Sequence, residues 1–426
     1  MTTTMPAATE SPAVDLERWP GLGPVPEDVR TVVARQVAGR LLRRVARRLP
    51  VRIEMPEGQP VAPAPADAPM LVVRRPRAFL SRLGRDGLIG FGESYMAGDW
   101  DAPDLAAVLT MFAAEVDRLV PLWLQRLRGL YDARHPVSDA NTVANARSNI
   151  ARHYDLSNEL FACFLDETMT YSSAKFDGEA GRPQWDDLAD AQRRKIDRLL
   201  DLAGVGQGTR LLEIGTGWGA LAIRAAERGA TVRSVTLSVE QQHLARARIA
   251  EAGHTGRIQV DLLDYRQVDG DHDAVVSVEM IEAVGHEYWR TYFEKVDDLL
   301  VPGGRAAIQA ITMPHDRMLA TRHTHTWVHK YIFPGGCLPS TEAIARTVEQ
   351  HTALRVTERL GLGRDYAETL RLWDERFRAA TDRLAGLGFD EVFRRMWHFY
   401  LEYSRSGFAS GYLDVQQILL TKAGGR

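Results

Sequence analysis

The sequence lacks the features of secreted and membrane-spanning proteins. Only two of its 426 residues are cysteines, Cys163 and Cys337, which are too few for a disulfide framework and suit a reducing compartment. No apolar run reaches the roughly 18 residues that a transmembrane helix needs, and the polar N-terminus lacks the pattern of a signal peptide. These absences predict a cytoplasmic protein, and a length beyond that of one ordinary hydrophobic core predicts two domains.

A metal-binding pattern is also absent. Four histidines lie near one another, but no cysteine or aspartate completes a spacing of four zinc ligands, so we expect no metal. These histidines are His315, His323, His325 and His329. The cysteines predict no catalytic nucleophile, because Cys163 lies in a helical apolar pattern and Cys337 lies in a Pro-Gly-Gly-Cys turn.

Acidic residues are missing from one stretch near the N-terminus. Residues 30–52 contain eight arginines and no aspartate or glutamate. Apolar residues recur there every four positions, at Val33, Val37, Leu41, Val45 and Leu49. Two interpretations stay open: a cationic amphipathic helix that lies on an anionic lipid surface, or a solvated face above a buried stripe. No aromatic-rich binding motif accompanies these charges, so we expect no nucleic-acid partner.

Composition also predicts how the chain is divided. Residues 1–28 are rich in Thr, Ala and Pro, which predicts disorder. Residues 29–135 should form a small, mostly helical N-terminal domain that associates with lipid or membrane and helps to present lipid, as the family resemblance described below implies. Within it, the Pro/Ala-rich residues 56–69 should form a linker or exposed loop. The catalytic domain should span residues 140–426, with an insertion at 314–372.

The most informative segment is a glycine-rich turn, Leu211 to Gly219 (LLEIGTGWG). The apolar run before it and the helical pattern after it predict a strand, a turn and a helix start, where backbone N–H groups can receive a small ligand. The glycines follow G-x-G-x-G and lack the third glycine of the dinucleotide spacing, which favours a nucleoside with an amino-acid tail. The alternative is that the turn needs glycine for its geometry alone.

Strands and helices should alternate after this turn. The expected elements are strands at 231–236, 258–261, 273–278 and 305–311 and helices at 240–252 and 288–300, with a turn at Pro302–Gly304. This order predicts an α/β fold with a doubly wound parallel sheet and a ligand beyond the carboxyl ends of its strands. The second strand ends in Thr236-Leu237-Ser238, followed by Gln241, instead of the acidic residue that usually holds ribose hydroxyls.

Several long segments together resemble the cyclopropane-fatty-acyl-phospholipid synthase family. They are residues 91–101 (FGESYMAGDWD), 149–176, 236–241 (TLSVEQ), 279–285 (EMIEAVG), 331–340 (YIFPGGCLPS) and 411–422. The resemblance covers roughly residues 70 to 422. It implies a class I, Rossmann-like S-adenosylmethionine methyltransferase that transfers a methyl group to a cis double bond in a lipid acyl chain.

The resemblance also implies which residues bind the cofactor. Glu213 should organise the turn near the amino-acid end of S-adenosylmethionine, and Asp264 or Tyr265 should lie near the adenine. The remaining candidates are Tyr171, Ser172, Gly215, Gly217, Trp218, Thr236, Leu237, Ser238 and Gln241.

The resemblance also implies which residues are catalytic, and at two of these positions this chain has a different residue type. In the family, an acidic residue, a histidine, a cysteine, a tyrosine and backbone groups hold a bicarbonate that acts as the base. The acidic residue matches Glu282, the tyrosine Tyr400 and the backbone group Ile311, whereas Ser173 replaces the cysteine and Gln309 the histidine. Serine and glutamine still bind anions, so bicarbonate and direct action of Glu282 both stay open as the base.

Because both departures fall at the base site, we expect the branch of the family that makes 10-methylene acyl chains. Cyclopropane synthesis, a small-molecule methyltransferase and a non-catalytic lipid-binding protein are the alternatives. The expected partners are a phospholipid surface with unsaturated acyl chains, such as oleoyl, and a separate reductase. We further expect a homo-oligomer that is peripheral at the inner face of the cell membrane.

Overall fold

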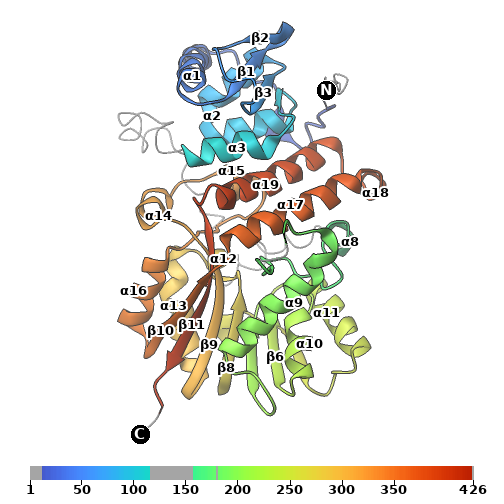
Figure 1. Ribbon diagram of the computed structural model, residues 1–426, viewed down its shortest axis with the longest axis vertical. Coiled ribbons are helices and arrows are strands. Elements are labelled where there is room, and N and C mark those ends of the chain that lie inside the picture. The colour runs from blue at the N-terminus through green and yellow to red at the C-terminus, as the bar shows by residue number, and fades with distance from the viewer. Residues whose placement is uncertain (1–11, 116–156, 179–180, 425–426) are drawn as a thin grey trace. The chain divides into compact units, whose positions relative to one another are not determined.

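The computed structural model describes residues 12–115, 157–178 and 181–424. The predicted domain boundaries at 135 and 140 and the start of the 149–176 motif lie outside these residues, so these boundaries stay predictions. The chain folds into two compact units (Figure 1). The first takes its described residues from Met1–Leu127 and Arg378–Ser406, and the second takes them from Arg128–Phe377 and Gly407–Arg426. Among the described residues, no helix combines the length and the apolar character needed to cross a membrane.

Helices and one small sheet form the first unit. The sheet has the order β2-β1-β3-β4, and only β1 and β3 pair in parallel. The elements are η1 (Pro20–Leu22), α1 (Val29–Arg48), β1 (Arg52–Met55), η2 (Pro56–Gly58), β2 (Gln59–Pro60), β3 (Met70–Val73), α2 (Pro76–Met96), β4 (Trp100–Asp101), α3 (Leu105–Ala114), α18 (Thr381–Gly386) and α19 (Glu391–Ala409), the last up to Ser406.

Aromatic side chains from both chain segments form the core of this unit. Phe91 stacks on Trp100 with ring centroids 4.5 Å apart, and Phe399 of α19 lies 5.3 Å from Tyr95 of α2. The sequence assigned residues 378–406 to the catalytic domain, whereas the structure groups them with the first unit. An amphipathic pattern shows that a helix has a buried face but does not show which partner buries it.

Residues 12–28 differ from the predicted disorder. The indole Nε1 of Trp19 donates to Asp390 over 2.8 Å, Arg82 donates to the carbonyl of Gly23 over 2.8 Å, and Leu22 is buried. Composition cannot reveal such anchoring, because it depends on single contacts far along the chain. The predicted loop at 56–69 contains a short helical turn and the two-residue strand β2, and its other residues are exposed or half-buried except for the buried Ala62.

The second unit is a seven-stranded, mostly parallel sheet in the order β10-β11-β9-β8-β5-β6-β7, in which β11 is antiparallel to both of its neighbours. The strands are β5 (Arg210–Ile214), β6 (Thr231–Thr236), β7 (Ile258–Leu262), β8 (His272–Val278), β9 (Leu300–Thr312), β10 (Leu354–Gly361) and β11 (Asp414–Lys422). The expected doubly wound α/β fold is therefore confirmed. The turn predicted at Pro302–Gly304 falls inside β9, where the register with β8 shifts between Leu300 and Arg305.

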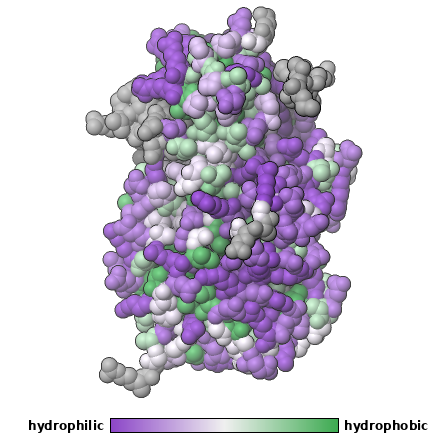
Figure 2. Space-filling model, viewed as in Figure 1, coloured by the Kyte–Doolittle hydropathy of each residue, from purple (hydrophilic) through white to green (hydrophobic). Residues whose placement is uncertain are grey.

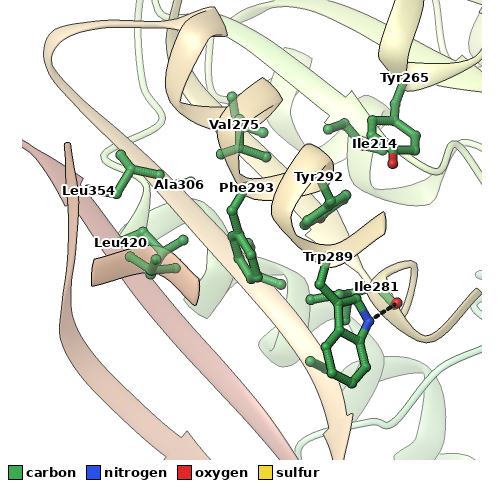
Figure 3. Packing of buried hydrophobic residues seen from close by; sticks show 14 of the residues in the cluster. Ile214, Tyr265, Val275, Ile281, Trp289, Tyr292, Phe293, Ala306, Leu354 and Leu420 are labelled. Atoms are coloured by element: carbon green, nitrogen blue, oxygen red, sulfur yellow. Dashed lines mark hydrogen bonds between the residues drawn. The ribbon is translucent and has the colours of Figure 1, made fainter. Parts of the chain in front are cut away.

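Helices cover both faces of this sheet (Figure 1). One face packs on α9 (Trp185–Leu202), α10 (Ala220–Glu227) and α11 (Val239–Glu251), and the other packs on α13 (Trp289–Leu299) and α16 (Thr341–His351). On the second face, apolar residues at helical spacing in α13 point into the core, where Trp289 donates to the carbonyl of Ile281 over 3.2 Å (Figure 3). The remaining elements are α8 (Asn158–Phe161), η4 (Tyr265–Gln267), α12 (Ile281–Val284), η5 (His286–Tyr288), α14 (His315–Thr321), α15 (Trp327–Tyr331) and α17 (Gly363–Ala379).

The insertion predicted at 314–372 is shorter in the structure. Helix α16 and strand β10 fall inside that range but belong to the sheet and its helical layer. Strand β10 was missed because it lies at the sheet edge, where four of its eight residues are charged or threonine and exposed. Its sequence is therefore typical of a surface loop.

Candidate active site

A pocket opens where four parallel strands end. Its lining includes Ile214 at the end of β5, Thr236 at the end of β6, Leu263 just after β7 and Val278 at the end of β8. In a doubly wound sheet this edge is where ligands bind. Of the predicted cofactor-binding residues, the lining contains Tyr171, Ser172, Gly215, Gly217, Trp218, Thr236, Leu237, Gln241 and Tyr265.

The glycine-rich turn leaves room for a ligand. Gly215 and Gly217 have φ values of +98° and +51°, which side chains rarely adopt. A Cβ on Gly215 would lie 2.6 Å from Met280 Cγ, whereas a Cβ on Gly217 would meet no protein atom within 4 Å. Gly215 therefore serves the packing of the turn, and Gly217 leaves open space in the pocket.

Glu213 holds the turn through a chain of hydroxyl groups. Ser234 Oγ donates to the Glu213 carboxylate over 2.5 Å and lies 2.7 Å from Thr216 Oγ1. Burial raises the pKa of Glu213 to about 8. This arrangement agrees with the predicted role of Glu213 in organising the turn.

Two predicted cofactor residues lie behind the lining. Ser238 caps α11, since its Oγ accepts from the backbone N–H of Gln241 over 3.2 Å. The carboxylate of Asp264 binds the guanidinium of Arg266 over 2.8 and 2.6 Å. Of the pair Asp264 and Tyr265, Tyr265 is the one that lines the pocket, and its buried hydroxyl has no hydrogen-bond partner among the described residues.

Ser173 and Gln309 converge on a carboxylate that the sequence reasoning missed. Glu279 accepts from the backbone N–H of Ser173 over 3.0 Å, from Gln309 Nε2 over 2.8 Å and from the hydroxyl of Tyr366 over 3.0 Å. Glu279 is partly exposed and follows directly after Val278, while the next residue, Met280, also lines the pocket. The groups expected to hold a free anion thus hold a carboxylate of the chain itself.

The backbone at Glu279 is strained. Its φ of +51° is unusual for a residue with a side chain, and Met169 of the pocket lining has a φ of +54°. Such conformations cost roughly 1–3 kcal/mol and persist where surrounding contacts enforce them, often at functional sites. Here the strained backbone directs the Glu279 carboxylate toward three donors.

Glu282 lies nearby in a different environment. One of its oxygens accepts from the backbone N–H of Ile311, and the other is buried with no partner in the described part of the chain. Burial, and then the charge of Glu279, raise the pKa of Glu282 to about 8. Burial also raises the pKa of Glu279, but three donors favour its ionised form. Both oxygens of Glu279 thus accept hydrogen bonds, whereas one oxygen of Glu282 has no partner among the described residues.

Other candidates have separate outcomes. Tyr400 lies on α19 in the first unit, where its ring centroid is 5.3 Å from that of Trp397, and its catalytic role stays a prediction. Among the described residues, no group of three or more His, Cys, Asp or Glu side chains could hold a metal ion.

Glu279 could have been noticed in the EMIEAVG motif, where it stands three residues before Glu282. Tyr366 gave no signal, because it lay in the predicted insertion.

Known proteins resemble this chain over most of its length. The family model for mycolic acid cyclopropane synthetase matches residues 141–418. The tuberculostearic acid methyltransferase UfaA1 of Mycobacterium tuberculosis is 57% identical over 418 residues, which cover 98% of each chain. The cyclopropane-fatty-acyl-phospholipid synthase of Escherichia coli is 33% identical over 84% of this chain and 88% of its own. The crystal structure of mycolic acid cyclopropane synthase CmaA1 complexed with SAH and CTAB aligns with a TM-score of 0.59 and 32% identity, over 65% of this chain and 98% of that chain.

Proposed function

The chain belongs to the mycolic acid cyclopropane synthetase family and is an S-adenosylmethionine-dependent methyltransferase, and on this premise we propose its substrate and product. It methylates the cis double bond of an unsaturated phospholipid acyl chain, such as oleoyl, and forms a 10-methylene-branched chain. The observation that carries this proposal is the Glu279 carboxylate beside the cofactor pocket, held by Ser173 and Gln309.

The pocket residues fit S-adenosylmethionine, which supplies an electrophilic methyl group. Gly217 leaves open space at the turn, and the unpartnered hydroxyl of Tyr265 can hydrogen-bond a nucleoside. Thr236 donates to Gln241 Oε1 over 2.8 Å, which fixes the Gln241 amide at the position where an acidic residue usually binds ribose. Hydroxyl and amide groups therefore take over that role.

Glu279 is the base in our proposal. Methyl transfer to an isolated alkene forms a carbon–carbon bond and leaves a cation on the neighbouring carbon. A 1,2-hydride shift moves the cation to the carbon that bears the new methyl group. Glu279 then accepts a proton from that methyl group, and the electrons of the C–H bond form the exocyclic double bond. A carboxylate fixed by three donors needs no bicarbonate for this step.

The relatives support this product and its alternative. The methylene product is favoured because a tuberculostearic acid methyltransferase is 57% identical over nearly the whole chain. A separate reductase could then act on the exocyclic double bond and complete a methyl branch. The alternative is a cyclopropane, as the 33% identical cyclopropane-fatty-acyl-phospholipid synthase suggests. In that case the base would remove a methyl proton while the ring closes, without a hydride shift.

Helix α1 supports a peripheral membrane role. Val29, Val33 and Val37 are 80%, 54% and 39% exposed, and the arginines between 40 and 48 are exposed as well. Figure 2 shows strongly hydrophilic side chains over α1. Arginines beside an exposed apolar stripe suit an anionic lipid surface. We propose that α1 binds the inner face of the cell membrane; the homo-oligomer stays a prediction.

Lipid analysis tests the proposed product. We expect phospholipids from cells that express the protein with an oleoyl-rich membrane to contain a methylated acyl chain. Its proton NMR spectrum should show vinylidene signals of an exocyclic methylene. Cyclopropane and methylene products have equal mass, so NMR, or catalytic hydrogenation under conditions that spare the ring, must distinguish them.

Two controls make the result decisive. The Glu279→Gln variant should yield little product while binding S-adenosylmethionine as the wild type does. Cyclopropane signals from the wild type would overturn the product assignment and leave the reaction class intact. A folded wild-type protein that does not bind S-adenosylmethionine would instead favour a non-catalytic lipid-binding protein.

A further inference from the structure

The pocket has one positive and one negative side chain in its lining. Among its described lining residues, Lys195 of α9 is the only lysine or arginine, and Glu213 of β5 is the only aspartate or glutamate. All other lining residues are apolar, neutral polar or glycine. Because burial raises the pKa of Glu213 to about 8, Lys195 is the lining residue with which an anionic group of a ligand can pair.

Lys195 is an unusual residue for its position. It lies on the buried face of α9 between Gln192 and Leu199, where an apolar side chain would be expected, and it is almost fully buried. Its ammonium donates to Ser172 Oγ over 2.7 Å, its only side-chain hydrogen bond, and it forms no ion pair within the described residues. Burial lowers the pKa of Lys195 to about 8, while the nearby Glu279, Asp166 and Glu213 raise it.

A buried ammonium without a paired anion is costly. The three neighbouring carboxyl groups form no ion pair with Lys195 within the described residues, and burial raises the pKa of each of them. Lys195 has three N–H donors, of which Ser172 takes one. An anionic group of a ligand would provide the missing partner.

The position of Lys195 indicates which part of the cofactor it meets. Thr236 and Tyr265 come from β6 and from the turn after β7, on one side of β5 in the sheet order. Lys195 lies on the other side, since its carbonyl accepts from Gln417 of β11, which also donates to Gln309 of β9. If Tyr265 and Thr236 face the nucleoside, Lys195 faces the amino-acid tail.

We infer that the Lys195 ammonium, together with the Ser172 hydroxyl, binds the carboxylate of the amino-acid tail of S-adenosylmethionine. This inference rests on the binding of S-adenosylmethionine in the pocket. The carboxylate is the only anion of this ligand, whose ammonium and sulfonium groups Lys195 repels. Pairing at Lys195 anchors the tail and keeps positive charge at the other groups away from α9. Lys195 is thus a cofactor-specificity residue.

Calorimetry with two ligands tests this role. Decarboxylated S-adenosylmethionine lacks only the carboxylate. The wild type should bind it about 10- to 100-fold more weakly than S-adenosylmethionine, the range for a hydrogen bond between charged groups. The Lys195→Met variant should lose the same factor for S-adenosylmethionine and should bind the two ligands about equally. The Lys175→Met control, whose side chain does not line the pocket, should behave as the wild type does.

Each other outcome contradicts the inference. Equal weakening of both ligands in Lys195→Met would show a purely structural role for the lysine. Equal affinity of the wild type for both ligands would exclude any positively charged side chain that recognises the carboxylate. This conclusion holds even if the Lys195→Met variant does not fold. A wild type that binds neither ligand would overturn the proposed function as well, so the two failures are distinguishable.

Discussion

At the scale of residues, the groups around Glu279 determine how the proposed reaction ends. The resemblance predicts that Ser173 and Gln309 replace a cysteine and a histidine that help to hold bicarbonate, and in the structure they hydrogen-bond the Glu279 carboxylate. A side-chain carboxylate has the same single negative charge as bicarbonate, and burial raises its basicity above that of an ordinary carboxylate. Its position is fixed by the chain, so it does not depend on dissolved bicarbonate.

Replacing Glu279 with glycine should convert the enzyme to one that needs an added anion. Glycine suits the φ of +51° at this position, so Glu279→Gly should fold and remove the acceptor of the Ser173 backbone N–H and of Gln309 Nε2. We expect turnover to fall by about 10²-fold or more, as for loss of a general base. Added bicarbonate or formate should restore part of it, whereas the wild type in degassed buffer should keep its full rate.

The pH dependence of turnover and the Glu282→Gln variant provide controls for the role of Glu279. Because burial raises the pKa of Glu279, turnover should rise with pH through a value above the usual carboxyl range, and Glu279→Gln should lack this step. Burial raises the pKa of Glu282 to about 8, so we expect Glu282→Gln to keep most of the turnover at neutral pH. A large loss in Glu282→Gln with near-normal Glu279→Gly would reverse the assignment.

At the scale of elements, the sequence predicted those helices and strands that depend on the local pattern of residues. Strand β6 has the predicted bounds Thr231–Thr236, and α13 differs from its prediction by one residue at each end. Strand β10 was missed because edge strands expose charged residues, and Glu279 was missed because its role depends on donors from three separate segments. Neither feature can be read from periodicity.

In helix α1 the buried face differs from the predicted apolar stripe. The predicted stripe included Val33 and Val37, but the buried face consists of small or medium residues: Thr31, Ala38, Gly39, Leu42 and Ala46. Helix α2 approaches so closely that a Cβ on Gly84 would lie 2.4 Å from the carbonyl oxygen of Ala34. Ala38, Gly39 and Ala46 permit this close packing, and Val33 and Val37 remain exposed outside it, available to lipid.

Removing two arginines of α1 should weaken membrane binding. Replacing Arg43 and Arg47 with Ala should cost about 1 kcal/mol per charge, or about 30-fold in binding to anionic vesicles. Sedimentation with such vesicles measures the effect, which should shrink at high salt. The matched change of the exposed Arg355 and Arg359 on β10 should have little effect. Equal sedimentation of both variants would show that α1 is an ordinary solvated helix.

At the scale of the whole molecule, the first unit is built from two distant chain segments. Arg395 of α19 donates to the carbonyl of Tyr95 over 2.7 Å and lies 4.2 Å above its ring, while Phe399 packs near Phe91, Tyr95 and Trp100. Removing residues 1–115 would take away these partners and expose the aromatic face of α19. Loss of packing around one buried Phe costs about 3–5 kcal/mol.

A chain without residues 1–115 should therefore be unstable, not merely unable to bind lipid. We expect aggregation or an unfolding midpoint well below that of the full chain in thermal denaturation followed by circular dichroism. The full-length Arg43→Ala/Arg47→Ala variant should unfold at the wild-type temperature, because both arginines are exposed. A monomeric truncated protein with the wild-type midpoint would contradict the two-segment unit. Lipid presentation by the first unit should accordingly be tested by substitutions on α1, since truncation would also destabilise the rest of its core.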